Sequence, residues 1–416
     1  MLVFYSLALL LVLVVGSPYW LIRMLTSGKY REGLSERLGF LPSRLRKSER
    51  VIWVHAVSVG EVLAASRLIE DLASRSDCTV MVSTTTRTGQ QLARKRFGAD
   101  RVFYFPLDFA FAVRACLRAL RPRMLLLLET EFWPRVLVEC RRAGVPVAVV
   151  NARISDRSWP RYLRLRFIWR RLLGSLALVL AQSELDAERL KALGASHVRV
   201  GGNLKYDIRV AQPAAVTDAL RAHLAADAKV IVCGSTLAGD EELIAASVPS
   251  HAITILAPRH PERFDAVAAI LAARGVRHVR RSQWMTAPHP LHPGTFFLLD
   301  SIGELASVYS LASVAVIGGG FLVPGGHNPL EPAQFGVPIV MGPHYENFRG
   351  IVEKLHETNA VTIAKPPDLP GAIRNLLDDS DAAKAMGARA LAVFESESGA
   401  TERAVSTLLA LLAVRV

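Results

Sequence analysis

At 416 residues the chain is long enough for two domains that each bury a sizeable core, and 51% of its residues are hydrophobic. The formal net charge of +13 is uneven, because residues 1–204 hold 32 Lys and Arg against 16 Asp and Glu, whereas residues 205–416 hold 18 against 21. The basic half indicates an anionic partner. The sequence has no recognisable nucleic-acid-binding motif, which argues against nucleic acid as that partner.

An apolar segment opens the chain. Residues 2–22 contain no charged side chain, and these 21 residues would span roughly 30 Å as a helix, the thickness of a bilayer core. Eight Lys and Arg side chains follow between Arg23 and Arg50. We therefore predict a retained transmembrane anchor over residues 1–22, with the rest of the chain in the cytoplasm by the positive-inside rule. A cleaved signal peptide is less favoured, because no Lys or Arg precedes the apolar run and no A-x-A site ends it.

Such an anchor changes the interpretation of the basic half. Anionic lipid head groups or a phosphorylated lipid substrate explain the charge better than nucleic acid does. The basic stretch 153–171 mixes arginines with Trp159, Tyr162, Phe167 and Trp169. This mixture is typical of a membrane interface or of a site for a lipid phosphate, although a solvated helix that covers its own core edge has the same composition.

Strand and helix patterns alternate through the first half of the chain. Residues 51–55 are a β-branched and aromatic run, residues 62–72 have helical periodicity, and further strand patterns occur at 79–83, 102–105, 124–128 and 147–150. Near-continuous apolar strands separated by helices predict a parallel sheet covered on both faces. Ligands of such sheets bind beyond the carboxyl ends of the strands, where Glu61, Glu129 and Glu131 fall.

A second alternating set follows a change of composition. Residues 206–228 are polar and Ala-rich and are predicted to form a linker, after which strand patterns occur at 230–233, 252–257, 276–279, 296–299, 314–317 and 338–341. We predict two parallel α/β domains, 23–205 and 229–416, that enclose a cleft, with the last helix able to pack back on the first domain. Four cysteines show no C-x-x-C or Cys/His pairing and are predicted to be reduced core residues.

Residues 314–332 combine an apolar run, five glycines and a helix start. Asn328 is predicted at the N-cap, Pro329 at N1 and Glu331 at N3. A helix N-terminus behind a glycine-rich loop favours anions, so this segment is a candidate ligand loop. A tight strand-to-helix turn with a capping box is the alternative. The spacing matches neither a P-loop nor a dinucleotide fingerprint.

Three carboxylates and one lysine are candidates for chemistry in the first predicted domain. Glu61 lies at the ligand edge and could act as a general base toward a hydroxyl, or it could only complete a capping box with Ser58. Glu129 and Glu131 face the same way if the chain is extended there, which implies a shared cation, hydroxyl or Arg; a helix-start cluster is the alternative. Lys205 ends a strand, where its ammonium could reach developing negative charge or could be a plain surface lysine.

In the second half, residues 258–264 follow a buried strand. There Arg259 offers a planar fork suited to phosphate and His260 a donor. Residues 300–305 begin another predicted helix, whose free amides form a second candidate anion site. No His/Asp/Glu spacing indicates a zinc or magnesium site.

Seven motifs occur in an order that matches a known family. They are residues 55–61 (HAVSVGE), 129–134 (ETEFWP), 151–155 (NARIS), 202–207 (GNLKYD), 258–264 (PRHPERF), 303–305 (GEL) and 325–331 (GGHNPLE). In these motifs the chain resembles the bacterial Kdo transferases, which attach 3-deoxy-D-manno-octulosonic acid (Kdo) from CMP-Kdo to the lipid A precursor. The match runs along nearly the whole chain.

The resemblance implies a GT-B fold of two Rossmann-like, doubly wound α/β domains, and an inverting, metal-independent glycosyltransferase without a cofactor. It implies that Glu61 is the general base and that Glu129 and Lys205 support the transition state. It further implies that the donor CMP-Kdo is held by Pro258, Arg259, Ile302, Gly303, Glu304, Asn328, Pro329, Leu330 and Glu331. The implied acceptor is the tetraacyldisaccharide bisphosphate lipid A precursor of lipopolysaccharide core biosynthesis, at the cytoplasmic face of the inner membrane.

The chain departs from the family pattern at one place. After Ser235-Thr236 the family usually continues His-Glu-Gly-Glu, whereas this chain has Leu237-Ala238-Gly239-Asp240. A donor contact by that His and Glu is therefore left open. Two alternatives remain at this point: another GT-B enzyme that uses a UDP-sugar, such as a lipid A disaccharide synthase or an epimerase, and a non-catalytic lipid-binding scaffold.

Overall fold

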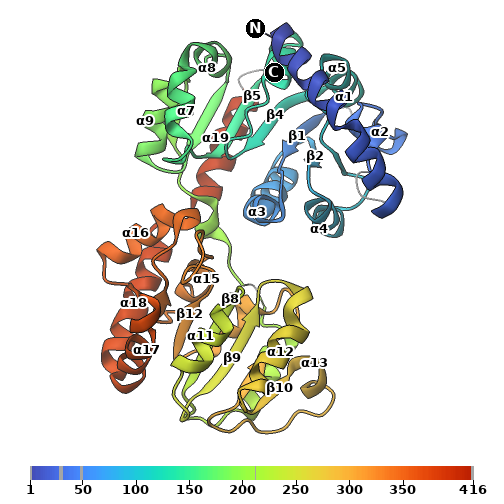
Figure 1. The fold of residues 1–416 in the computed structure, drawn as a ribbon. Helices are drawn as coiled ribbons and strands as arrows, with labels where there is room; N and C mark the ends of the chain where they lie inside the picture. The colour runs from blue at the N-terminus through green and yellow to red at the C-terminus, as the bar shows by residue number, and fades with distance from the viewer. Residues whose placement is uncertain (1, 28–30, 47–49, 211, 414–416) are drawn as a thin grey trace. The chain divides into compact units, whose positions relative to one another are not determined.

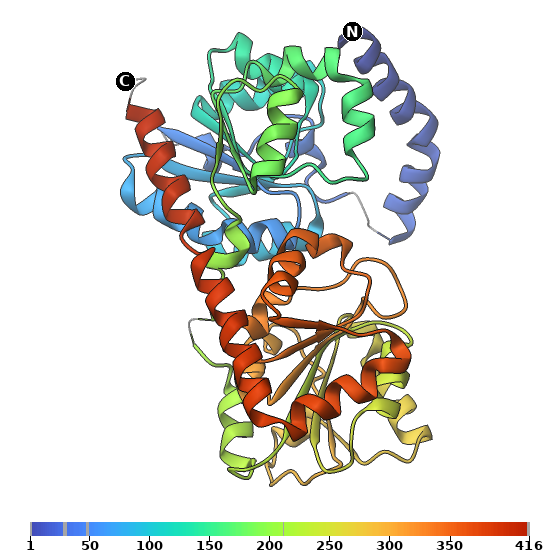
Figure 2. The same cartoon turned by 90° about the vertical axis from the view of Figure 1, so that its left-hand side faces the viewer.

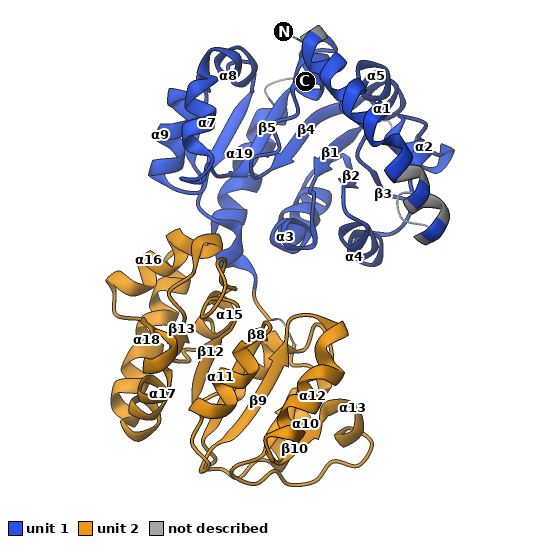
Figure 3. Ribbon diagram, in the orientation of Figure 1, with its two compact units in different colours: residues 1–208, 398–416 blue, residues 209–397 orange. Residues whose placement is uncertain are grey.

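The computed structural model describes residues 2–27, 31–46, 50–210 and 212–413, so Lys29 and Lys47 of the basic flank lie outside the described residues. The chain forms two compact units, unit 1 (residues 1–208 and 398–416) and unit 2 (residues 209–397) (Figure 1, Figure 3). The segment predicted as a linker, 206–228, contains helix α10 (Ala215–His223), because the buried side chains of Val216 and Leu220 give it an apolar face. The last helix, α19 (Ala400–Ala413), belongs to unit 1 and packs on α3 (Val59–Arg75) (Figure 2).

Unit 1 is built on a seven-stranded sheet in which every described pairing is parallel, as predicted. The strand order is β3 (Val102–Tyr104), β2 (Thr79–Thr84), β1 (Val51–His55), β4 (Pro122–Leu128), β5 (Val147–Ala152), β6 (Leu178–Ala181), β7 (Val198–Val200). The order reverses between β1 and β4, and such a switch point is where open parallel sheets bind their ligands. The remaining helices of unit 1 are α1 (Leu2–Ser27), α2 (Leu34–Arg37), η1 (Ser43–Arg46), α4 (Arg87–Phe97), α5 (Ala110–Leu120), α6 (Pro134–Arg142), α7 (Trp159–Arg164), α8 (Arg166–Leu173), α9 (Glu184–Ala192) and η2 (Leu204–Asp207).

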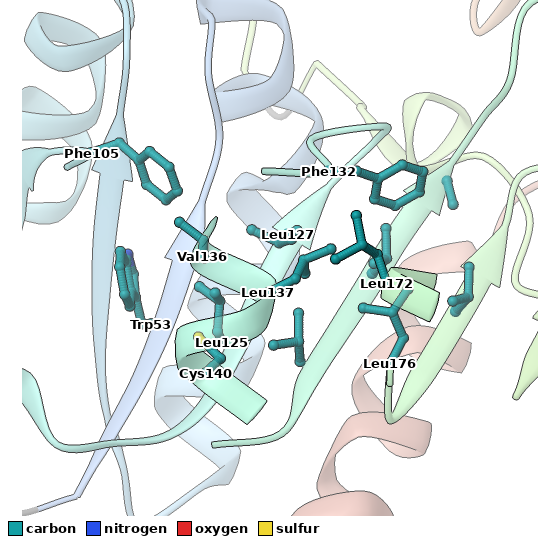
Figure 4. Close-up of a cluster of buried hydrophobic side chains, with 14 of the residues drawn as sticks. Trp53, Phe105, Leu125, Leu127, Phe132, Val136, Leu137, Cys140, Leu172 and Leu176 are labelled. Atoms are coloured by element: carbon teal, nitrogen blue, oxygen red, sulfur yellow. The ribbon is translucent and has the colours of Figure 1, made fainter. Parts of the chain in front are cut away.

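Apolar side chains fill both faces of this sheet. On one face Val136, Leu137 and Cys140 of α6 lie over Leu125 and Leu127 of β4 (Figure 4). A second buried cluster on unit 1 joins β1, β4, α3 and α19. All four cysteines are buried and free, which confirms that they are core residues. Because the strands are covered on both faces, their carboxyl ends are positioned rigidly for the side chains that follow them.

Unit 2 repeats the parallel arrangement with another order. Its strands are β10 (His278–Arg280), β11 (Phe296–Leu298), β9 (Ile253–Pro258), β8 (Val230–Thr236), β12 (Val314–Ile317), β13 (Ile339–Met341) and β14 (Val361–Ile363). The switch point lies between β8 and β12. Besides α10, the helices of unit 2 are α11 (Asp240–Ser247), η3 (Pro261–Arg263), α12 (Phe264–Ala273), α13 (Arg281–Trp284), α14 (Leu305–Val308), η4 (Tyr309–Leu311), α15 (Leu330–Ala333), η5 (Glu346–Phe348), α16 (Arg349–Glu357), η6 (Pro366–Asp368), α17 (Leu369–Asp378) and α18 (Ser380–Ser396).

The first helix, α1, is hydrogen-bonded to the rest of unit 1. The Tyr5 hydroxyl donates to the Asp108 carboxylate at 2.8 Å, and the Arg135 guanidinium donates to Ser6 Oγ at 2.7 Å. Within the described residues, no helix combines the length and the apolar character needed to cross a membrane. The transmembrane anchor predicted over residues 1–22 is therefore not supported. The sequence pattern did not show that polar side chains near the start of this segment are bonded to the domain.

Candidate functional site

Glu61 lies in the first turn of α3, just beyond the end of β1 at the switch point of unit 1. One carboxylate oxygen accepts a hydrogen bond from the Val57 amide at 2.8 Å and the other accepts from the Ser58 hydroxyl at 3.1 Å. Burial raises the pKa of Glu61 to about 7, against the lowering effect of the Val57 bond, and the charges of Glu129 and Glu131 raise it further. A carboxyl group with this pKa is suited to accept a proton near neutral pH.

The capping-box alternative for Glu61 is only partly realised. Ser58 is the N-cap of α3, but its side chain makes no capping hydrogen bond to the backbone and donates to Glu61 instead. Glu61 itself bonds the Val57 amide. The carboxylate is thus oriented by two donors, which is compatible with a chemical role as well as with capping.

Glu129, directly after β4, and Lys205, in η2 after β7, form an ion pair. Lys205 Nζ lies 3.9 Å from a Glu129 carboxylate oxygen. Glu129 has a left-handed φ of 54°, so the extended chain assumed in predicting that Glu129 and Glu131 face the same way is absent, and that assumption was wrong. Glu131 instead accepts a hydrogen bond from the Trp133 indole at 2.9 Å, and burial raises its pKa.

Lys205 is presented by the short helix η2, which is supported by Asn151 and Asn203, residues of the motifs at 151–155 and 202–207. Asn151, at the end of β5, has a left-handed φ of 60° and is 1% exposed. Its side-chain oxygen accepts from the Leu204 amide at 3.1 Å, while the Asn203 side chain accepts from the Lys205 amide at 3.0 Å. Asn tolerates left-handed backbone better than most residues, which explains why it suits this position.

In unit 2 the glycine-rich segment lies at the switch point between β8 and β12. Gly319, with φ 73°, donates its amide to the Asp240 carboxylate at 2.6 Å, and a Cβ at this residue would lie 2.5 Å from the His327 ring. Asp240 also accepts from the Leu237 amide at 3.0 Å. The segment that departs from the family pattern therefore still holds the glycine-rich loop through Asp240, a residue whose importance the sequence reasoning missed.

Polar groups gather beside this loop. Burial raises the pKa of Glu331, while the positive charge of Arg259 opposes that shift. Burial together with Arg259 and His260 lowers the pKa of His327 to about 4, which keeps the imidazole neutral at pH 7. Arg259 follows the buried Pro258 at the end of β9, is itself exposed, and donates its amide to the Thr236 carbonyl at 3.0 Å. An exposed guanidinium beside a neutral imidazole and a partly buried carboxyl group suits a ligand that carries both phosphate and hydroxyl groups.

The sequence relatives decide the family. A family model described as 3-deoxy-D-manno-octulosonic-acid transferase matches residues 32–208. The 3-deoxy-D-manno-octulosonic acid transferase of Haemophilus influenzae is 32% identical over 396 residues, covering 92% of each chain, and that of Bordetella pertussis is 36% identical over 376 residues, covering 86% of each. The chain belongs to the Kdo transferase family.

Solved structures of low sequence identity share the architecture of this Kdo transferase. The UDP-GlcNAc 2-epimerase from Neisseria meningitidis matches with a TM-score of 0.59 at 12% identity, covering 86% of this chain and 99% of that one. MurG from Acinetobacter baumannii matches with a TM-score of 0.53 at 14% identity, covering 86% and 98%. Together with the two parallel seven-stranded sheets, these likenesses support the predicted GT-B fold.

The two helix starts predicted in unit 2 of this Kdo transferase lead into helices of only 4 residues each. The segment Ile302, Gly303 and Glu304 precedes α14. The Glu304 carboxylate accepts hydrogen bonds from the Arg281 guanidinium at 2.7 Å and from the Ser301 hydroxyl. Asn328 accepts from the Leu330 amide at 3.2 Å, and α15 begins at Leu330 with Pro329 as its N-cap. The N-cap is thus Pro329 instead of the predicted Asn328. Asn328 precedes the N-cap, and its side-chain oxygen still accepts a hydrogen bond from the first residue of the helix.

The aromatic and basic stretch 153–171 divides between core and surface. Tyr162 of α7 and Trp169 of α8 pack on Phe132, with ring centroids 6.5 and 6.1 Å away, whereas Phe167 is 71% exposed. The packing of Tyr162 and Trp169 agrees with helices that cover their own core edge, and the membrane-interface interpretation stays a prediction. Across the described ranges of the chain, no cluster of three or more His, Cys, Asp or Glu side chains could hold a metal ion.

Proposed function

We propose that the chain transfers Kdo from CMP-Kdo to the lipid A precursor, a tetraacyldisaccharide bisphosphate, with inversion at the anomeric carbon, in lipopolysaccharide core biosynthesis. The observation that carries the proposal is Glu61, a carboxyl group with a pKa of about 7 at the switch point of a Kdo transferase family member. The Lys205–Glu129 ion pair follows strands of the same sheet.

In the proposed reaction the Glu61 carboxylate takes the proton of an acceptor sugar hydroxyl. The freed oxygen forms a bond to the anomeric carbon of Kdo as the bond from that carbon to the CMP phosphate oxygen breaks, so the bonding electron pair leaves with CMP. Attack opposite the leaving group inverts the centre. The Lys205 ammonium, oriented by Glu129, stabilises the negative charge of the reacting groups.

The donor is assigned to unit 2, where Arg259, Glu331 and the glycine-rich loop lie together. CMP leaves with its charge stabilised by the Arg259 guanidinium, and this role requires no metal or cofactor. The stretches Ile302–Glu304 and Asn328–Glu331 are proposed to contact the nucleotide. Support for these roles comes from the polar groups and pKa shifts around His327 and Glu331.

We predict that Arg259→Ala raises the KM for CMP-Kdo by about 10- to 100-fold, the loss expected for a hydrogen bond to a charged group, with a smaller change in KM for the acceptor. Initial rates of CMP release across a donor titration measure it. Arg274→Ala is the matched control, because Arg274 is also an exposed arginine of unit 2, directly after α12. An unchanged donor KM in Arg259→Ala would remove this residue from the donor site.

We propose that the protein acts at the cytoplasmic face of the inner membrane and contacts the lipid surface through α1. Supporting this location, several large apolar side chains among the described residues of α1 are exposed, with Leu11 at 64% and Val15 at 71%. Leu11→Glu/Val15→Glu is expected to lower co-sedimentation with vesicles containing anionic phospholipid at least about tenfold, since buried apolar area drives such binding. Leu185→Glu, at a 53% exposed residue of α9, should bind as the wild type does. Equal binding of both variants would contradict the location.

The transfer reaction is tested by incubating the protein with CMP-Kdo and the tetraacylated precursor. The expected result is release of CMP together with a product heavier than the acceptor by one or more Kdo residues. Consumption of a UDP-sugar instead would favour another GT-B activity. Lipid binding without turnover of any nucleotide sugar would favour the scaffold, and either outcome would overturn the proposal.

A further inference from the structure

Asp207 lies two residues after Lys205, at the end of η2 and directly before the chain leaves unit 1. It is only 8% exposed. Its two carboxylate oxygens accept hydrogen bonds from the amides of Gly399 at 2.6 Å and Thr401 at 2.5 Å, where α19 begins. The Ser398 hydroxyl adds a bond to the Tyr206 carbonyl at 3.1 Å. The helix that carries Lys205 is therefore tied to the start of a helix almost two hundred residues later in the sequence.

The other side of η2 is held by the sheet and by the core. The Leu204 amide donates to Asn151, and the Leu204 side chain lies in the same buried cluster as Ala400 and Ala404 of α19. Helix η2 also packs against α3, the helix whose first turn carries Glu61. Lys205 thus projects toward Glu129 from a turn that is clamped between β5 and α19.

A carboxylate at a helix N-terminus is stabilising in its own right, so Asp207 could serve only as a cap for α19. Capping does not account for the whole arrangement, because the same carboxylate fixes the position of the η2 backbone, residues 204–207, relative to α19. We propose that Asp207 is a positioning residue for the transfer reaction: by joining α19 to η2 it places the Lys205 ammonium against Glu129. This inference rests on the proposed role of Lys205.

The first test is Asp207→Asn, which keeps the size of the side chain but turns one acceptor into a donor that faces a backbone amide. We expect kcat to fall about 10- to 100-fold, because small displacements of a catalytic group have effects of that size, while KM for CMP-Kdo stays within about threefold. Asp186→Asn is the matched control: Asp186 is also 8% exposed in unit 1 and accepts the Ile154 amide at 2.8 Å. It should lower the melting temperature with kcat within about threefold of wild type.

The second test combines Asp207→Asn with Lys205→Ala. If Asp207 acts through Lys205, the added substitution causes no further loss of kcat in the Lys205→Ala background. A further loss as large as in the wild type would show that Asp207 acts otherwise and would overturn the inference. Wild-type turnover of Lys205→Ala alone would instead overturn the proposed role of Lys205, so the two failures are distinguishable.

A milder variant keeps the test decisive if Asp207→Asn does not fold. Ser398→Ala removes the hydroxyl that donates to the Tyr206 carbonyl and leaves the Asp207 carboxylate in place. We expect kcat to fall about two- to fivefold, while the melting temperature stays within about 2 °C of that of the wild type. In the Lys205→Ala background the same substitution should cause no decrease in kcat. A decrease that persists in that background would contradict the positioning role.

Discussion

Glu61→Gln is expected to lower kcat for Kdo transfer by about 10²- to 10⁴-fold, the range that removal of a general base produces. The amide keeps the shape of the side chain, so KM for CMP-Kdo should change little. Initial rates of CMP release at saturating donor and acceptor measure the effect. Glu70→Gln is the control, because Glu70 lies on the same helix but forms an exposed ion pair with Arg96. Turnover by Glu61→Gln at the wild-type rate would remove Glu61 from the catalytic role.

The pH dependence gives an independent test of the same role. The base must be ionised, and its pKa is raised to about 7, so kcat/KM should rise with pH through about 7 and level off above it.

The contribution of Glu61 to the stability of the fold should decrease over the same range of rising pH. The folded protein retains on Glu61 a proton that the unfolded chain has lost above its ordinary pKa of 4.5, so this group's contribution to stability decreases as pH rises from 4.5 to about 7. Glu61→Gln should weaken that decrease in pH-dependent unfolding, and an unchanged decrease would contradict the raised pKa.

Lys205→Ala is expected to lower kcat by about 10²- to 10³-fold, comparable with the loss of a preorganised group that stabilises transition-state charge. The ammonium is 3.9 Å from Glu129, and its removal leaves that carboxylate without its cation. Single-turnover rates with saturating CMP-Kdo separate this effect from donor binding. Lys191→Ala is the control, since Lys191 is an exposed lysine on α9 of the same unit. A higher donor KM with an unchanged kcat would instead place Lys205 in substrate binding.

The two sheets were predictable because their strands are buried on both faces and therefore form continuous apolar runs. Residues 51–55 and 124–128 show such runs in the sequence, and β1 and β4 contain them. The order of the strands was not predictable, because local periodicity carries no information about which strands become neighbours. Only that order shows that β1 and β4 flank the switch point and bring Glu61 and Glu129 to the same edge.

The sequence pattern did not show three features of the folded chain: one expectation was wrong, one is not supported, and one residue was underestimated. The chain at Glu129 is left-handed instead of extended. The segment predicted to span a membrane is bonded through Tyr5 to Asp108. Asp240 was noticed only as a departure from a family pattern, although it holds Gly319. None of these contacts leaves a periodic signal, since each joins residues far apart in the chain or depends on a single dihedral angle.

By itself the sequence determined the class of fold, the family and the identity of the candidate residues, because these depend on residue types and on their spacing along the chain. Only the tertiary structure decided the protonation and the placement of those residues. The pKa of Glu61 depends on burial and on two other carboxylates, and the position of Lys205 depends on Asn151 and on Asp207 at the start of α19. Desolvation and hydrogen bonds between distant segments exist only once the chain is folded.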